Sequence, residues 1–224
     1  VSTIDEDSLV EGFMFDGSSI AGWKSIEASD MKLMLDTDTA YVDPFYAEKT
    51  ICVHCSVVEP DTGEAYERDP RGTAQKAEAY LKASGIGDVA YMGPEAEFFL
   101  FDNVKFSNSI NKVSYEVDAS DASWNTDTDY EMGNMGHRPG LKGGYFPVNP
   151  TDEAQDLRAE MLSTMKRLGM KVDKHHHEVA SCQHELGLIF GTLTEQADEL
   201  QKYKYVIHNV AHAYGKSATF MPKP

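Results

Sequence analysis

The sequence predicts a protein of the α+β class, in which a strand-rich domain precedes a domain that mixes helices with strands. Residues 1–63 contain short alternating runs separated by turn residues, whereas three later stretches have apolar residues at helical spacing. The chain has 224 residues, 41% of them hydrophobic, which is enough to build one large core or two smaller ones. We therefore expect two folded domains, covering residues 1–63 and 69–224.

The first domain is expected to consist mainly of short strands. Alternating or apolar runs predict strands at residues 13–15, 31–35, 40–42 and 51–58. Turn-forming residues lie between these runs, and Pro60–Gly63 form a strong turn after the last one.

A helix and a buried strand open the second domain. Asp69–Pro70 suit the N-cap and first position of a helix, and Gly85 is typical of its end. The apolar run at residues 91–101 predicts one buried strand. A polar stretch follows at residues 107–137, in which residues 112–117 alternate like a hairpin strand.

Two further helices are expected in the second half of the chain. Thr151 is the predicted N-cap of the first, which Gly169 ends. The second begins near Thr192, with Glu195 in the capping-box position, and stops at Gly215. The sequence shows no internal repeat and no low-complexity linker.

Charge and hydropathy exclude several classes of function. The 37 acidic and 20 basic side chains give a formal charge of −17, which repels a polyphosphate backbone, so nucleic-acid binding is not expected. No apolar run is long enough to cross a bilayer, and the first residues lack the pattern of a secretory signal, so no membrane association is expected. The chain begins without Met and ends at Pro224 with no closing element, so it is expected to be cut at both ends.

The three cysteines predict reduced thiols in a cytoplasmic protein. Cys52 and Cys55 form a CxxC, but they lie in a run that alternates like a strand. A redox CxxC usually opens a helix, and a zinc site would need two more ligands. A structural role for these cysteines is therefore favoured.

Glu95 and Glu97 are the first candidates for chemistry. They stand two apart in an apolar segment, so a strand would place both carboxylates on one face. Neighbouring carboxylates repel each other unless they are protonated or bound to a cation, and Mg²⁺ or Mn²⁺ would resolve the conflict. A strand end whose acids reach water explains the same segment, and both interpretations remain open.

A run of three histidines, His175–His177, precedes Glu178, and Glu185 follows seven residues later. On a strand, His176 and Glu178 share a face. Histidines favour zinc or another transition metal, whereas the carboxylates favour Mg²⁺ or Mn²⁺. Consecutive residues of a strand point in opposite directions, so at least one histidine is expected to be structural.

Two other strings are uninformative by themselves. Asp16–Ser19 alone predicts an ordinary turn, and the glycines and aromatics of Gly143–Pro147 are typical of close backbone packing. The chain contains none of the glycine-rich phosphate loops GxxxxGK[ST] and GxGxxG, and no GxSxG nucleophile motif.

Taken together and in order, these strings resemble the bacterial-type (class I) glutamine synthetase family. The matching segments are Phe15–Ile20, Ala28–Asp30, Gly93–Phe99, Gly143–Pro147, His175–Ala180, His208–His212 and Lys216–Pro224. The resemblance covers essentially the whole chain. It implies an N-terminal β-grasp domain without its first strands, followed by the first part of the catalytic domain.

The resemblance implies a glutamate–ammonia ligase, which makes γ-glutamyl phosphate from ATP and L-glutamate before ammonia attacks it. It further implies two or more Mg²⁺ or Mn²⁺ ions per site. Glu97, Glu178 and Glu185 match the family's ligands of one metal, and Glu95 matches a ligand of the second. The spacing from Glu178 to Glu185 is one residue shorter than in the enteric enzymes.

Four other residues match the substrate sites of the family. Asp16 matches the residue that binds ammonium and takes its proton, and Ser19 and Tyr145 match residues that line this pocket. Asp173 stands where the family has a Glu that contacts the nucleotide. The family assembles as a dodecamer of two hexameric rings, with each active site between neighbouring subunits.

The resemblance leaves two alternatives. A γ-glutamyl-amine ligase would use a polyamine in place of ammonia, although Asp16 favours ammonium. A catalytically dead structural relative would have no reason to keep the four glutamates. The family's Asn-Gly-Ser-Gly-x-His stretch, glutamate-binding arginines and flap lie beyond Pro224, so we expect this chain to be inactive by itself.

Overall fold

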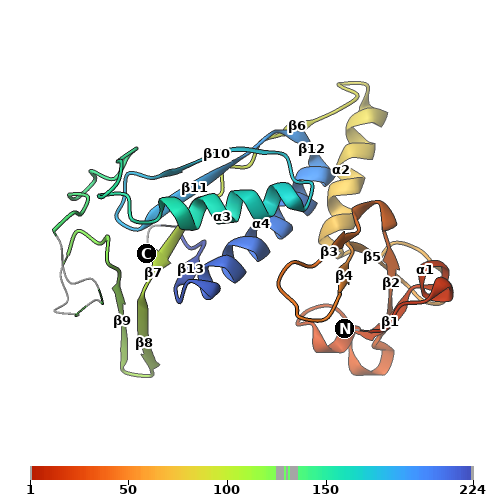
Figure 1. The fold of residues 1–224 in the computed structure, drawn as a ribbon. Coiled ribbons are helices and arrows are strands. Elements are labelled where there is room, and N and C mark those ends of the chain that lie inside the picture. Colours follow the sequence, from red (N-terminus) through yellow and green to blue (C-terminus); the bar gives the residue numbers. More distant parts are fainter. Residues whose placement is uncertain (1, 125–128, 130, 132–135, 223–224) are drawn as a thin grey trace. The chain divides into compact units, whose positions relative to one another are not determined.

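The computed structural model describes residues 2–124, 129, 131 and 136–222, and it divides into two compact units (Figure 1). The first unit comprises the chain up to Met92 together with Gly191–Glu199. The second comprises Gly93–Phe190 and the chain from Leu200 onward. Both units contain helices and strands, which confirms the predicted α+β class.

The first unit is built around a small antiparallel sheet with strand order β1-β2-β5. Met31, Val57 and Tyr66 form its buried core, and Phe15 and Trp23 pack against them. Its elements are α1 (Glu6–Glu11), β1 (Phe13–Asp16), η1 (Gly17–Ser19), η2 (Ile26–Ala28), β2 (Asp30–Leu35), η3 (Thr37–Thr39), β3 (Tyr41–Val42), β4 (Ile51–Cys52), β5 (Cys55–Val58), α2 (Pro70–Ser84), β6 (Tyr91–Met92) and β12 (Gly191–Thr192).

Most of the expected elements of this unit are present. The strands expected at residues 13–15, 31–35 and 40–42 are confirmed as β1, β2 and β3, and α2 has its predicted caps, Asp69 and Gly85.

The single strand expected at residues 51–58 is wrong, because Val53 and His54 separate β4 from β5. The backbone of His54 bonds instead to Asp36 and to the side chain of Thr39, at 2.9 Å each. These bonds tie His54 to the η3 turn, so it does not pair in a ladder.

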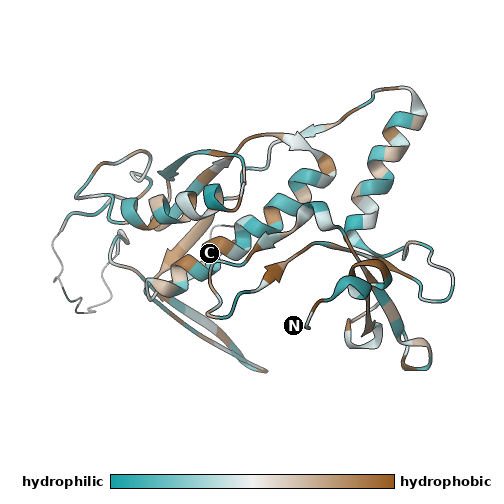
Figure 2. Ribbon diagram, turned by 45° about the vertical axis from the view of Figure 1, so that its right-hand side comes forward, coloured by the Kyte–Doolittle hydropathy of each residue, from teal (hydrophilic) through white to brown (hydrophobic). Residues whose placement is uncertain are grey.

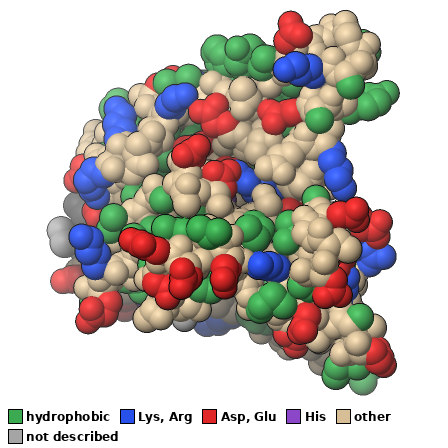
Figure 3. All heavy atoms as spheres, turned by 90° about the vertical axis from the view of Figure 1, so that its right-hand side faces the viewer, with side chains coloured by type: hydrophobic (Ala, Val, Ile, Leu, Met, Phe, Trp, Pro, Cys, Tyr) green, Lys and Arg blue, Asp and Glu red, His purple; other side chains and the backbone are tan. Residues whose placement is uncertain are grey.

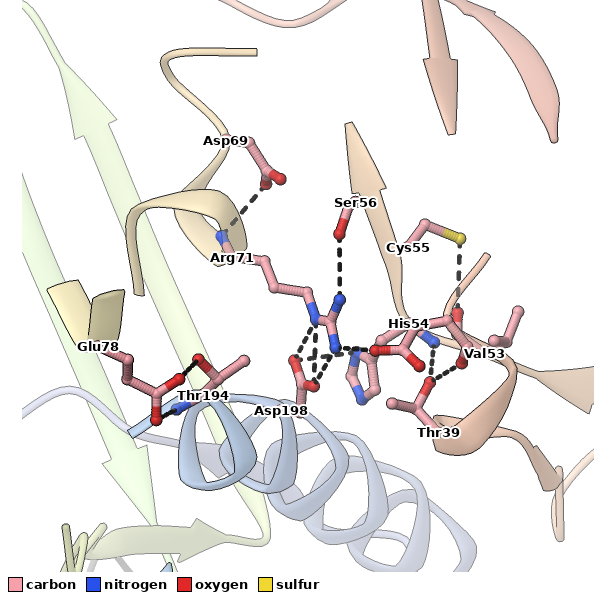
Figure 4. A network of polar contacts seen from close by, with 11 residues as sticks. Thr39, Val53, His54, Cys55, Ser56, Asp69, Arg71, Glu78, Thr194 and Asp198 are labelled. Atoms are coloured by element: carbon pink, nitrogen blue, oxygen red, sulfur yellow. Dashed lines mark hydrogen bonds and ion pairs between the residues drawn. The ribbon is translucent and has the colours of Figure 1, made fainter. Parts of the chain in front are cut away.

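Arg71, in the first turn of α2, is the centre of a polar network in this unit (Figure 4). Its guanidinium donates to both carboxylate oxygens of Asp198 at 3.0–3.1 Å and to Asp36 at 2.5 Å. It also donates to the hydroxyl of Ser56 at 3.1 Å. Because Asp198 lies on the first turns of α4, Arg71 bonds this distant stretch of sequence to β5 and the η3 turn.

The second unit is organised by a four-stranded antiparallel sheet with strand order β10-β11-β7-β13. All four residues of β7 are buried, and this strand is hydrophobic along its length (Figure 2). The elements of this unit are β7 (Phe98–Phe101), β8 (Asn103–Ser109), β9 (Lys112–Asp118), α3 (Gln155–Arg167), β10 (Val172–His177), β11 (Gln183–Leu188), the remainder of α4 (Leu193–Ala213) and β13 (Ser217–Thr219).

Helix α4 places one stripe of residues in the core of the second unit. Tyr203, Val206, Ile207, Val210 and Ala211 are all buried, and they recur at helical spacing. The helix begins at Leu193, where the backbone N–H of Thr192 donates to the carboxylate of Glu195 at 3.3 Å, so its predicted start is confirmed.

The buried strand expected at residues 91–101 is wrong in its first half. Only residues 98–101 form β7, whereas Tyr91 and Met92 form the short exposed strand β6. Between them, residues 93–97 lie outside any strand. Pro94 has no N–H to donate to a ladder, which favours a break at this point.

The helix expected to start at Thr151 begins instead at Gln155, after Ala154 as N-cap. The N–H groups of Thr151 and Asp152 bond to the carbonyl of Val148 and form a turn. The hairpin strand at 112–117 is confirmed as β9, which pairs with β8. Residues 125–128, 130 and 132–135 of the predicted polar stretch lie outside the described residues, as do residues 223–224.

No helix in the described part of the chain is both long and apolar enough to span a bilayer. On the face shown in Figure 3, acidic side chains are spread over the surface and basic ones lie singly among them.

Candidate metal centre

Strands β10 and β11 bring His176 and Glu185 directly opposite each other in the register of the sheet. Glu178 lies just beyond the end of β10. His176 Nε2 is 2.6 Å from Glu178 Oε1 and 3.7 Å from Glu185 Oε2. One donor atom from each of these three residues lies within 4.8 Å of the other two, a spacing at which they could share a cation.

Glu95 and Glu97 approach this group from the segment before β7. Gln183 Nε2 donates to Glu97 Oε2 at 2.5 Å, and both glutamates act electrostatically on Glu185. They line a surface pocket of about 290 Å³ together with Lys204 and Phe220. The structure thus gathers all four glutamates that the sequence singled out.

The expectation that Glu95 and Glu97 lie on one face of a buried strand is wrong. Both residues are exposed and lie in an irregular segment, so they are not two neighbours on one face of a buried strand. The crowding instead centres on Glu185, which is buried on β11.

Burial raises the pKa of Glu185, and the charges of Glu95, Glu178 and Glu97 raise it further, whereas His176 opposes this effect. A hard divalent cation would relieve the repulsion, since carboxylate oxygens are the ligands that Mg²⁺ and Mn²⁺ prefer. The residues present therefore fit such an ion, with His176 as an additional nitrogen donor beside it.

The segment before α3 supports this site with aromatic rings. Phe146 stacks on His176 at 4.8 Å between ring centroids, and Tyr145 meets the same ring edge-on at 5.8 Å. Gly144 is buried against the backbone after β10, and its N–H donates to the carbonyl of Val179. A Cβ atom at Gly144 would clash with the Glu178 carbonyl, so the close approach requires glycine.

The other two histidines of the run have structural partners. His177 Nδ1 donates to the Glu178 carbonyl at 2.7 Å, and its Nε2 lies 3.0 Å from the carboxylate of Asp121, so both ring nitrogens have a partner. Burial opposes a positive charge on this ring, but the bond and charge of Asp121 outweigh it and raise the pKa of His177. His175 Nδ1 accepts a hydrogen bond from the buried Arg158 at 3.3 Å.

Asp121, His177 and His184 form a second group of potential ligands, all buried. Arginine can only donate, so His184 Nδ1 accepts from Arg158 Nη1 at 3.1 Å and the proton of this ring lies on Nε2. Burial holds the pKa of His184 well below its ordinary value. All three side chains thus already have polar partners within the core.

The remaining predicted residues lie elsewhere. Asp16 and Ser19 are exposed and belong to the first unit, where the Asp16 carboxylate accepts from the N–H and hydroxyl of Ser18 and from the hydroxyl of Ser19. The Ser18 and Ser19 bonds lower the pKa of Asp16. Asp173 lies on β10 three residues before His176, beside Gly187 of β11 and at an irregularity in the strand register.

Sequence reasoning missed two buried residues that contact the glutamate segments, Gln183 and Tyr203. Gln183 bonds to Glu97, and the hydroxyl of Tyr203 bonds to the carbonyl of Ala96 at 2.8 Å. No local pattern distinguishes either residue from an ordinary core residue, because their partners lie about 90 to 110 positions away in sequence.

The fold and this site define a class: a two-part α+β protein whose second part gathers acidic side chains from separate segments of the chain into a candidate divalent-metal centre. Comparison with known proteins assigns the family. Residues 1–60 match the family description "Glutamine synthetase, beta-Grasp domain", and residues 67–224 match "Glutamine synthetase, catalytic domain". The chain belongs to the glutamine synthetase family, which confirms both the resemblance and the β-grasp assignment.

Individual relatives agree with this assignment. The chain is 76% identical over 221 residues to a glutamine synthetase of Cereibacter sphaeroides, with 99% of this chain and 47% of the relative covered. It is 62% identical to one of Azospirillum brasilense, with 100% and 48% covered. The Plasmodium falciparum glutamine synthetase structure superimposes with a TM-score of 0.88 at 28% identity, with 99% and 43% covered. The chain thus spans about half the length of the relatives it matches.

Proposed function

We propose that this protein joins ammonia to the γ-carboxylate of L-glutamate at the expense of ATP, giving L-glutamine. The observation that supports this proposal is the convergence of Glu95, Glu97, Glu178 and Glu185 in a catalytic domain of this family. The two domains that the sequence predicts, residues 1–63 and 69–224, are part of the same proposal.

In this proposal Glu97, Glu178 and Glu185 hold one divalent cation, Mg²⁺ or Mn²⁺, and Glu95 helps to hold a second. Bound cations would neutralise the negative charge that otherwise keeps ATP and glutamate apart. The pocket beside Glu95 and Glu97 gives reactants access to these carboxylates. Asp173 is the proposed contact to the nucleotide.

The reaction requires two group transfers. A γ-carboxylate oxygen of glutamate attacks the γ-phosphorus of ATP, and the bond from this phosphorus to ADP breaks. Ammonia then attacks the carbonyl carbon of γ-glutamyl phosphate, and inorganic phosphate leaves. Ammonium must first lose a proton, and Asp16 is the proposed acceptor.

The lowered pKa of Asp16 keeps this carboxylate negatively charged, which suits it to hold an ammonium cation beside it. Ser19 already contacts this carboxylate, and Tyr145 is the third proposed residue of the ammonium pocket. We further propose a cytoplasmic dodecamer of two hexameric rings, in which Asp16 of one subunit serves the metal centre of the next.

Metal binding can be measured on this chain directly. We expect Mn²⁺ titration, followed by the loss of the free-ion electron paramagnetic resonance signal, to show saturable binding. Glu178→Gln should weaken it, because one anionic ligand is lost, whereas Glu64→Gln, at an exposed carboxylate of the first unit, should not. Binding that is absent, or equal in both variants, would refute the metal centre.

The reaction is tested with the gene product at its natural length. We expect ADP release from ATP and glutamate to depend on ammonium and to yield glutamine. Amide formation only with putrescine or spermidine would favour a γ-glutamyl-amine ligase. Metal binding without turnover of any amine would favour a catalytically dead relative.

A further inference from the structure

The segment that contains Glu95 and Glu97 has no strand to hold it. Residues 93–97 precede β7 and lie outside any ladder, and both glutamates are exposed. Glu185 lies within β11, whereas Glu178 lies one residue beyond β10 and Glu97 one residue before β7, whose Phe98 pairs with His184 of β11. Glu95 and Ala96 have no ladder partner, so side chains that bond this segment to the sheet help to set the distance between the two pairs of carboxylates.

Tyr203 makes the first of these connections. Its side chain is fully buried in α4, and its hydroxyl donates to the carbonyl of Ala96, between the two glutamates, at 2.8 Å. The same hydroxyl accepts from the N–H of Leu186, the residue after Glu185, at 3.2 Å. One oxygen atom thus connects the backbone beside Glu97 with the backbone beside Glu185.

Gln183 makes the second connection. Its amide Nε2 donates to Glu97 Oε2 at 2.5 Å, and its Oε1 accepts from the N–H of Ala180 at 3.3 Å. Its backbone carbonyl accepts from the N–H of Glu178 at 2.7 Å. Only 2% of the residue is exposed, so water cannot easily replace these bonds.

We infer that Tyr203 and Gln183 are positioning residues for the metal centre, and that they set the spacing between the Glu95–Glu97 segment and the Glu178 and Glu185 carboxylates. This inference rests on the proposed function, since it assigns the two residues to the same site. Neither residue is itself a proposed ligand. Both act through residues that are proposed ligands or lie next to them.

Tyr203→Phe tests the inference with little change in volume. Residues that orient metal ligands typically contribute about 10–100-fold to metal affinity, and we expect a loss in this range. The matched control is Tyr66→Phe, because the buried Tyr66 also donates to a backbone carbonyl, that of Trp23, at 2.8 Å. Both variants should lower the thermal stability, but only Tyr203→Phe should weaken Mn²⁺ binding.

Gln183→Met provides an independent test if Tyr203→Phe does not fold. Methionine preserves the length of the side chain and removes both hydrogen bonds of its amide group, so we expect Mn²⁺ affinity to fall about 10–100-fold. Gln196→Met is its control: Gln196 is 4% exposed and, among the described residues, makes no hydrogen bond to the four glutamates. Circular dichroism and thermal unfolding of each variant separate loss of folding from loss of binding.

The outcomes distinguish the inference from the proposed function. If the unmodified chain does not bind Mn²⁺, the metal centre itself is refuted. If it binds Mn²⁺, and the Tyr203 and Gln183 variants fold and bind it as tightly as their controls, the positioning role is refuted. Weaker binding in these two variants alone supports it.

Discussion

Replacing Arg158 by methionine should destabilise the second unit far more than a substitution that removes an exposed charge would. Arg158 lies on α3 with 1% of its side chain exposed, and its partner Asp152 has 5% exposed. The guanidinium forms two bonds to this carboxylate, at 2.9 and 2.5 Å, and also donates to His184. Methionine would fill similar space but leave the carboxylate buried without its partner.

The expected cost follows from this burial. Breaking a buried ion pair by removing one partner typically costs about 3–5 kcal/mol, because the remaining charge has lost its hydration and its counter-charge. Each 1.4 kcal/mol is about a factor of ten, so the equilibrium between folded and unfolded forms should shift by two to more than three powers of ten. Asp152→Leu combined with Arg158→Met should recover most of the loss, since neither charge of this pair remains buried.

Hydrogen exchange of the backbone amides of β10 and β11 in increasing urea measures the unfolding free energy of this unit separately from the other. Lys105→Met is the control, because Lys105 and Glu116 form an exposed pair 3.5 Å apart with 66% and 60% of their side chains exposed. Such a pair contributes about 0.2–1 kcal/mol. An Arg158→Met cost no larger than that of the control, or a double variant as unstable as the single one, would refute the reasoning.

Three further predictions concern other parts of the second unit. Gly144→Ala should weaken Mn²⁺ binding and lower the melting temperature, because the added Cβ would lie 2.7 Å from a ring carbon of His177. Gly140→Ala is the control and should change neither, because the space around Gly140 is open. Burial raises the pKa of both the Cys52 and the Cys182 thiol, but Cys182 is fully buried and Cys52 only partly. Cys182 should therefore react with iodoacetamide more slowly than Cys52 at pH 8, and peptide mapping that finds equal rates would contradict this. Burial raises the pKa of Asp121, but the hydrogen bond and charge of His177 outweigh it and lower this pKa below 3.8. Asp121 should therefore stabilise the fold above pH 3.8, and this stability should be lost as the pH falls through the lowered pKa. The difference in urea midpoint between the unmodified chain and Asp121→Asn should close in acid, and a difference independent of pH would contradict the assignment.

Local sequence determined much of the fold. The caps of α2 and the start of α4 were predictable because capping depends on residues within one helical turn. Thr151 shows the limit of this reasoning. It has the composition of an N-cap, but the chain turns at Val148, and Asp152 bonds to the buried Arg158, so the N-cap of α3 is Ala154, three residues later.

The amino-acid sequence by itself also determined the family, because its motifs occur in the family's order, and it pointed to the four glutamates. Only the tertiary structure placed Glu185 among the other glutamates and beside His176, and only it showed that Gln183 and Tyr203 bond to Glu97 and to the backbone of Ala96. The physical reason is separation along the chain. Caps and turns are decided within a few residues. The sheet must form before β10 and β11 come into register and before residues about 90 to 110 positions apart can bond to each other.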